Sequence, residues 1–269
     1  MDSLVSTEWL ANEMGACDLR IVDASYFLAD HQRDAAAEYE AAHIPGAVFM
    51  DLGNLVDAES AVPNTLPPAE KFASRMQSLG LGDGSRIVLY DNSPLRSAAR
   101  AWFMLTMFGA HGVAILDGGL AKWQAEGRPV AQGKESLRHR HFTIWQDERQ
   151  LRRKGDMLAN LETGREQVID ARSAERFEQG HIPGARNIPY DSLFQADGTW
   201  KSQADLQQAF ADAGVDLTRP IVASCNSGIT ANIPLFALHL IGKQGALYDG
   251  SWSEWCADSD APKETGAAR

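Results

Sequence analysis

The pentapeptide His-Ile-Pro-Gly-Ala stands at residues 43–47 and returns at residues 181–185. Three further pairs of segments recur in the same order along the chain: Ile-Val-Asp-Ala at 21–24 and Val-Ile-Asp-Ala at 168–171, Ile-Val-Leu-Tyr-Asp at 87–91 and Ile-Val-Ala-Ser-Cys at 221–225, and Leu-Asp-Gly-Gly at 116–119 and Tyr-Asp-Gly-Ser at 248–251. Solenoid repeats have periods of roughly 20 to 50 residues. The longer period here indicates two duplicated domains.

Within each copy, short β-branched runs alternate with stretches of helical character. Residues 87–90 read Ile-Val-Leu-Tyr, and the apolar, alanine-rich stretch 97–105 follows. This rhythm is typical of an α/β domain. We therefore expect two domains, 1–130 and 151–269, each a mainly parallel sheet flanked by helices, joined by a linker at 131–150. The charges of the linker, including the basic run at 138–141, are expected to face water.

The composition and net charge of the chain exclude some classes of binding partner. The chain has 269 residues, 44% of them hydrophobic, and a net charge of -11. An acidic protein is repelled by nucleic acid and by anionic membranes, so neither is an expected partner. No apolar stretch approaches the roughly 20 residues that span a bilayer, and residues 1–6 lack the features of a secretory signal, which predicts a cytoplasmic protein. Cys17, Cys225 and Cys256 fit reduced thiols and show no metal-ligand spacing.

The cysteine of the second copy carries the predicted chemistry. Cys225 follows an expected strand at 220–224 and precedes a helix expected at 231–241 and interrupted early by Pro234. Backbone N–H groups and the helix dipole converge at such a turn and favour anionic sulfur. A small glycine and two hydroxyls let the loop curl around a thiolate or a persulfide. The active-site loop that we predict after the cysteine consists of Asn226, Ser227, Gly228, Ile229 and Thr230.

Two other interpretations of Cys225 compete with this prediction. A single cysteine is commonly a small buried hydrophobe, but a loop rich in hydrogen-bond donors is hard to explain as core packing. A cysteine phosphatase requires an arginine at the sixth position after the cysteine to bind phosphate oxygens. That position is Ala231, which disfavours phosphatase chemistry. For Cys17 and Cys256, nothing nearby indicates catalysis.

These residues resemble the tandem-domain rhodanese superfamily over almost the whole chain. The repeated His-Ile-Pro-Gly-Ala and the segments at 116–119 and 248–252 look like motifs of that family. The loop at 225–230 is similar to the Cys-Gly-Ser-Gly-Val-Thr of 3-mercaptopyruvate sulfurtransferases, whereas thiosulfate-using members carry basic residues after the cysteine. Cations would stabilise dianionic thiosulfate, and Asn226 and Ser227 are neutral.

The resemblance implies a sulfurtransferase in which 3-mercaptopyruvate gives its sulfur to Cys225. The persulfide then passes to a thiol such as thioredoxin, or to cyanide, with no metal or organic cofactor. Asp91 replaces the cysteine in the first copy, which cannot carry sulfur. The alternatives are a thiosulfate sulfurtransferase and a non-catalytic module that binds an anion or persulfide for regulation.

The resemblance also assigns a substrate residue. Arg176, in Glu-Arg-Phe at 175–177, matches the family arginine that binds the substrate carboxylate. A second substrate arginine lies in a family insertion that this chain lacks between Phe177 and His181, and Gly53 replaces a first-domain aspartate. Candidates to replace the arginine are Arg172, Arg186 and Arg96, and Asp51 is a candidate for the aspartate.

Two repeated pairs are expected to be structural. His43 and His181 each precede Ile-Pro-Gly, and a role in closing that turn accounts for their presence in both copies. Asp117 and Asp249 are expected to organise local turns through backbone hydrogen bonds.

Overall fold

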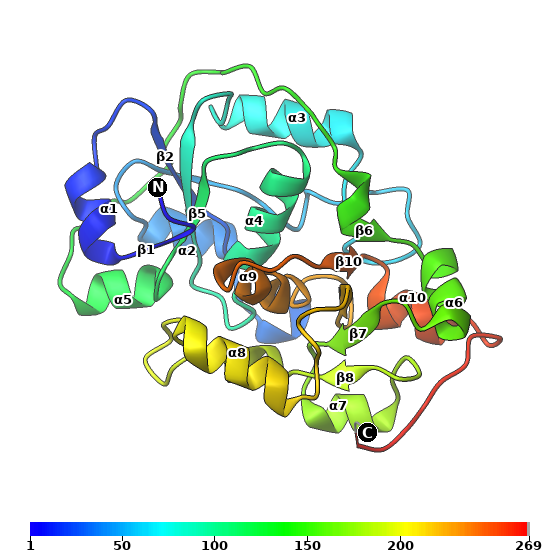
Figure 1. Ribbon diagram of the computed structural model, residues 1–269. Coiled ribbons are helices and arrows are strands. Elements are labelled where there is room, and N and C mark those ends of the chain that lie inside the picture. The colour runs from blue at the N-terminus through cyan, green and yellow to red at the C-terminus, as the bar shows by residue number, and fades with distance from the viewer. Residues whose placement is uncertain (268–269) are drawn as a thin grey trace. The chain divides into compact units, whose positions relative to one another are not determined.

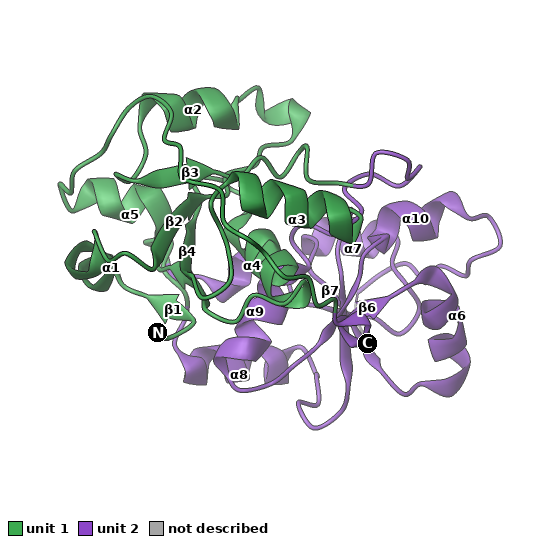
Figure 2. Ribbon diagram, turned by 90° about the horizontal axis from the view of Figure 1, so that it is seen from above, with its two compact units in different colours: residues 1–56, 67–146, 196–200 green, residues 57–66, 147–195, 201–269 purple. Residues whose placement is uncertain are grey.

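A computed structural model describes residues 1–267, which form two compact units (Figure 2). Unit 1 consists of Met1–Val56, Pro67–Gln146 and Ala196–Trp200. Unit 2 consists of Asp57–Leu66, Asp147–Gln195 and the residues from Lys201 onward. Each half of the chain therefore contributes one short segment to the unit formed mainly by the other half.

Unit 1 is a parallel five-stranded sheet with helices around it (Figure 1). Its strands lie in the order β1-β5-β4-β2-β3. The elements are β1 (Leu4–Val5), α1 (Thr7–Glu13), β2 (Leu19–Asp23), a 3-10 helix (Ala29–His31), α2 (Ala35–Ala41), β3 (Ala47–Phe49), α3 (Ala69–Ser78), β4 (Arg86–Tyr90), α4 (Ala98–Met107), β5 (Val113–Leu116) and α5 (Gly119–Ala125).

Unit 2 repeats this topology, with strand order β6-β10-β9-β7-β8, again all parallel. The elements are a 3-10 helix (Glu148–Gln150), β6 (Leu151–Arg152), α6 (Lys154–Thr163), β7 (Gln167–Asp170), α7 (Ala174–Gln179), β8 (Arg186–Asn187), a 3-10 helix (Tyr190–Leu193), α8 (Gln203–Asp212), β9 (Ile221–Ser224), α9 (Asn232–Leu240), β10 (Ala246–Tyr248) and α10 (Ser251–Ala257). The predicted duplication and α/β class are confirmed.

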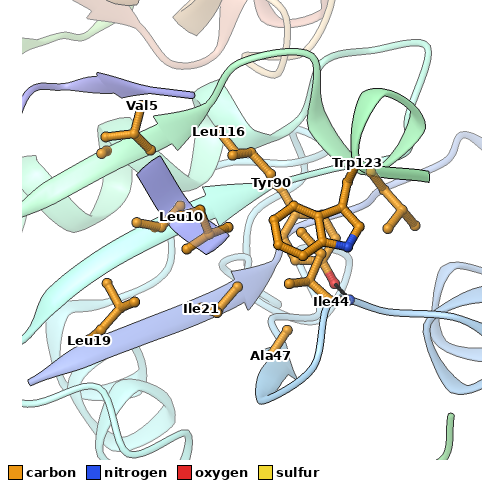
Figure 3. Packing of buried hydrophobic residues seen from close by; sticks show 12 residues of the cluster. Val5, Leu10, Leu19, Ile21, Ile44, Ala47, Tyr90, Leu116 and Trp123 are labelled. Atoms are coloured by element: carbon orange, nitrogen blue, oxygen red, sulfur yellow. Dashed lines mark hydrogen bonds between the residues drawn. The ribbon is translucent and has the colours of Figure 1, made fainter. Parts of the chain in front are cut away.

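One core of unit 1 lies where β2, β4 and β5 face α1 and α5 (Figure 3). Trp123 is fully buried there beside Tyr90 and Leu116. The Tyr90 hydroxyl accepts a hydrogen bond of 3.2 Å from the Ile44 amide, which ties the 43–47 turn to β4. Buried apolar side chains thus hold the repeated turn against the sheet, and one buried hydroxyl satisfies its backbone.

The two repeated histidines have the same structural role. His43 Nδ1 lies 2.8 Å from the Tyr39 carbonyl and the ring stacks on Tyr39. His181 Nδ1 lies 2.9 Å from the Phe177 carbonyl and stacks on Phe177. Both rings are buried. The predicted structural role at the turn is therefore confirmed.

Residues 131–146, expected to be a solvated linker, pack along unit 1. Phe142 is buried, and both the amide and the hydroxyl of Thr143 donate to the Asp83 carboxylate. A Cβ on Gly82 would stand 2.4 Å from the Cβ of Arg140, so only glycine permits this approach. The basic side chains at 138–141 face water as expected.

Helix α9 differs from its prediction in one respect. Pro234 lies in the first turn of the helix and does not interrupt it. The first four N–H groups of a helix have no partner within it, so proline costs no hydrogen bond there. Nearly all of α9 is buried, which explains why its sequence is apolar on every side.

Candidate active site

Cys225 lies directly after β9, and helix α10 holds its backbone. The Cys225 amide donates to Ser251 Oγ at 3.2 Å, and its carbonyl accepts from the Trp252 amide at 3.0 Å. Ser251 Oγ donates in turn to the Tyr248 carbonyl at 2.9 Å. Ser251 has a φ of +51°, which is rare for serine and indicates that the surrounding contacts impose it. Cys225 itself is 1% exposed.

The loop after Cys225 leaves several amides without a partner. Within the described part of the chain, no group accepts a hydrogen bond from the backbone N–H of the residues Asn226, Ser227, Ile229, Thr230 and Ala231. The loop carbonyls are occupied: Asn232 Nδ2 donates to the carbonyls of Gly228 and Ile229 at 2.7 and 2.8 Å. Gly228 provides the left-handed turn, with φ +78°. Consecutive unpaired amides form an anion-binding nest, and this nest begins directly after the thiol.

The equivalent loop of the first copy has the same length, but the side chain of Asp91 occupies its interior. Helix α4 begins seven residues after Asp91, as α9 does after Cys225. The Asp91 carboxylate accepts from the amides of Ser93 and Ala98 at 3.0 and 2.8 Å. Burial raises the pKa of this carboxyl, while the two amides oppose that effect. An internal carboxyl thus occupies the place that an anionic sulfur needs.

Two equivalent hydrogen bonds hold the short segments that each half of the chain contributes to the other unit. Leu66, in the segment that joins unit 2, donates its amide to Asp249 Oδ2 at 2.7 Å. Trp200, in the segment that joins unit 1, donates its amide to Asp117 Oδ1 at 2.9 Å. The predicted local role of the two aspartates is therefore incomplete, because each also binds a segment distant in sequence.

The segment 57–66 also reaches the cysteine loop. Asn64 Nδ2 donates to Ser227 Oγ at 3.0 Å. Three residues that support the site, Asn64, Asp249 and Ser251, were not among the site residues predicted from the sequence. The duplicated motifs offered a signal for Asp249 and Ser251, because both lie in one. Asn64 lies outside the motifs recognised from the sequence, and its equivalence to Gly198 is visible only in the structure.

Arg172, a candidate for the second substrate arginine, is engaged inside unit 2. Its guanidinium pairs with Asp170 at 2.5 to 3.0 Å and donates to the Gly180 carbonyl at 2.7 Å. It also lies 4.7 Å from the ring centroid of Trp252, whose amide holds the Cys225 carbonyl. Because Arg172 is only 5% exposed and is paired with Asp170, it is not placed to bind a substrate.

The other predicted arginines differ in their surroundings. Arg176 is exposed on α7, and no described residue accepts a hydrogen bond from its guanidinium. The strands β7 and β9 are neighbours, with Asp170 level with Ser224, so the loops leading to Arg176 and Cys225 leave one edge of the sheet. Its carboxylate-binding role stays a prediction. The remaining replacement candidates lie elsewhere. Arg186 packs beside Gly214, and Arg96 belongs to unit 1. The carboxylate of Asp51 accepts hydrogen bonds from Asn54.

Among the described residues, no group of three or more His, Cys, Asp and Glu side chains is placed to hold a metal ion. No helix among these residues has the length and apolar character needed to cross a membrane. Cys17 and Cys256 are both exposed thiols.

Comparison with known proteins agrees with this geometry. The rhodanese-like domain family matches residues 6–126 and 154–258. The 3-mercaptopyruvate sulfurtransferase of Rattus norvegicus is 38% identical over 94% of this chain and 91% of its own, and the thiosulfate sulfurtransferase of Cricetulus griseus is 36% identical over 98% and 94%. The crystal structure of the 3-mercaptopyruvate enzyme SseA from Escherichia coli matches with a TM-score of 0.88 at 37% identity, over 94% of this chain and 99% of that one. The chain belongs to the rhodanese-like family and contains two copies of its domain.

Proposed function

We propose that this protein is a sulfurtransferase that takes sulfur from 3-mercaptopyruvate through a persulfide on Cys225. The observation that supports this proposal most directly is the contrast between the Asp91 loop and the Cys225 loop, which have equal length. The Asp91 loop is filled by its own carboxylate, whereas the Cys225 loop presents a thiol and unpaired amides. Relatives named for this activity cover nearly the whole chain, which supports the assignment.

The transfer is balanced without a cofactor. The Cys225 thiolate attacks the sulfur of mercaptopyruvate, forming an S–S bond while the C–S bond breaks. The carbon keeps the bonding electrons and leaves as pyruvate enolate, which takes a proton to become pyruvate. An acceptor thiolate then attacks the outer sulfur and releases Cys225 as thiolate, so that no net oxidant is consumed. The loop amides stabilise the anionic sulfur at each stage.

The neutral loop favours mercaptopyruvate over thiosulfate. Thiosulfate is a dianion, and the side chains of Asn226 and Ser227 bring no cation to it. Arg176 is the predicted partner of the mercaptopyruvate carboxylate. A thiol such as thioredoxin is the proposed acceptor, and cyanide serves as its laboratory substitute. A cytoplasmic location stays a prediction from the sequence.

The test is mass spectrometry of the intact protein after incubation with each donor. Mercaptopyruvate should add one sulfur atom to the wild type and none to Cys225→Ser, and addition of cyanide should remove it. The matched control is Cys256→Ser, which alters an exposed thiol and should load normally. Absence of added sulfur with both donors would overturn the enzyme assignment and favour an anion-binding module.

The choice of donor has its own measurement. Arg176→Ala should raise KM for mercaptopyruvate by about tenfold or more, the worth of one charge-assisted hydrogen bond. Its matched control is Arg165→Ala, an exposed arginine for which the structure gives no site contact. An unchanged KM in Arg176→Ala would show that the carboxylate binds elsewhere.

A further inference from the structure

The duplication places two equivalent residues over the two loops. Asn64 lies two residues before Leu66, whose amide binds Asp249, and Gly198 lies two residues before Trp200, whose amide binds Asp117. Both have left-handed backbone, with φ +61° for Asn64 and +83° for Gly198. The same turn therefore carries glycine over the Asp91 loop and asparagine over the Cys225 loop.

The glycine is the unstrained choice at such a position. A residue with a Cβ is disfavoured in the left-handed region, and asparagine is among the few that enter it. Asparagine thus stands where the duplicate has glycine, at a position whose glycine in the first copy also leaves room for the Arg96 guanidinium. The benefit visible in the structure is the hydrogen bond of 3.0 Å from Asn64 Nδ2 to Ser227 Oγ.

The serine equivalent to Ser227 in the first copy is used differently. Ser93 Oγ donates to the Tyr26 carbonyl at 2.5 Å and accepts from the Leu95 amide at 3.1 Å. Its proton is committed to the protein. Ser227 is 8% exposed and, within the described residues, has the Asn64 amide as its hydrogen-bond partner.

We propose that Asn64 is a positioning residue that fixes the Ser227 hydroxyl as a hydrogen-bond donor to the anion in the Cys225 loop. A hydroxyl has one proton and two lone pairs. Because the Asn64 amide donates to one lone pair, the proton of Ser227 is left for the anionic sulfur or for the departing enolate oxygen. Asn64 does not titrate, so it cannot take the proton of Ser227 as a base.

The inference rests on the proposed function and deepens it by assigning a direction to one hydrogen bond. The contact lies wholly within unit 2, which contains both the segment 57–66 and the cysteine loop. The Leu66 amide bond to Asp249 anchors the segment two residues after Asn64. A fixed anchor of this kind lets a neutral side chain orient a hydroxyl before the anion arrives.

The sharpest test is Asn64→Asp, which keeps the shape of the side chain and reverses the hydrogen bond. The ionised carboxylate only accepts, so it draws the Ser227 proton away from the loop. We expect kcat for mercaptopyruvate to fall by about 100-fold at pH 8, and by about tenfold in Asn64→Ala, which removes the donor without reversing it. The control Asn12→Asp adds the same charge at an exposed position of α1 and should retain wild-type kcat.

The pH profile separates orientation from a structural defect. The introduced carboxyl regains an O–H donor when protonated, so the ratio of Asn64→Asp to wild-type kcat should increase as pH falls from 8 to 4.5. In a Ser227→Ala background, Asn64→Asp and Asn64→Ala should each cost less than about threefold. A ratio independent of pH, or full additivity with Ser227→Ala, would overturn the inference. Wild type that loads no sulfur would instead refute the proposed function.

Discussion

At the scale of single residues, two equivalent buried aspartates have different partners. Asp23 and Asp170 each end the second strand of their sheet, and each accepts the amide of the residue two positions on. That residue is Ser25 in the first copy and Arg172 in the second. Asp170 therefore has a buried guanidinium, whereas burial of Asp23, against hydrogen bonds from Ser25 and Tyr90, raises its pKa to about 6.

The raised pKa of Asp23 predicts a pH-dependent stability cost. Because the ordinary pKa of an aspartate is 3.8, the folded protein binds more protons at Asp23 than the unfolded chain does between about pH 4 and pH 6. The contribution of Asp23 to the stability of the fold therefore falls as pH rises through that window, by about 3 kcal/mol in all. The free energy of unfolding of Asp23→Asn, measured with urea, should therefore rise relative to that of wild type as pH increases from 4.5 to 7.5.

The matched substitution in the second copy should behave in the opposite way. Asp170→Asn leaves the buried Arg172 without its carboxylate, which costs about 3 to 5 kcal/mol at pH 7.5. Equal effects of the two substitutions would contradict this assignment of partners.

At the scale of elements, each exchanged segment depends on one aspartate of a duplicated turn. Asp249 precedes α10, the helix that also holds the backbone of Cys225 and Asn226. Asp117 precedes α5, in the unit whose loop contains Asp91. The same contact thus supports a loop with a thiol in one copy and a loop filled by its own carboxylate in the other.

This equivalence provides a matched pair of variants. Asp249→Ala and Asp117→Ala each remove a charge-assisted hydrogen bond to a backbone amide, worth about 1.5 to 3 kcal/mol. We expect similar losses of stability by urea unfolding. Sulfur transfer should fall by tenfold or more only in Asp249→Ala, because only that segment carries Asn64 to the Cys225 loop. Equal losses of activity would show that the exchange acts through general stability.

At the scale of the whole molecule, neither half of the chain contains a complete unit. Residues 57–66 belong with unit 2 and residues 196–200 with unit 1. A chain cut between Gln146 and Asp147 would therefore leave each fragment with a segment of its own packed in the other unit. The loss of one peptide bond would leave these contacts intact.

A specific protease site inserted between Gln146 and Asp147 tests this arrangement. After cleavage, the two fragments should co-elute on size exclusion as one species at the elution volume of the uncut variant, and should retain sulfur transfer. The uncut insertion variant is the control. Separation of the fragments in native buffer would contradict the exchange of segments.

The sequence by itself determined the duplication, the α/β class, the family resemblance and the cysteine loop. These features are local: a five-residue turn, a strand ending at Cys225 and a helix after it are encoded by contiguous residues. The absence of an active loop in the first copy could likewise be predicted from Asp91. The reason, a carboxylate that accepts the amides of its own loop, is visible only in the tertiary structure.

Only the tertiary structure decided which distant residues serve the site. Asn64 and Ser227 are 163 positions apart, and Leu66 and Asp249 are 183 apart, so no local pattern links them. Arg172 is an arginine in the sequence whether it binds a substrate or pairs with Asp170, and burial alone distinguishes the two roles. A side chain's chemistry is local, but its partner is set by chain packing, which brings remote segments together.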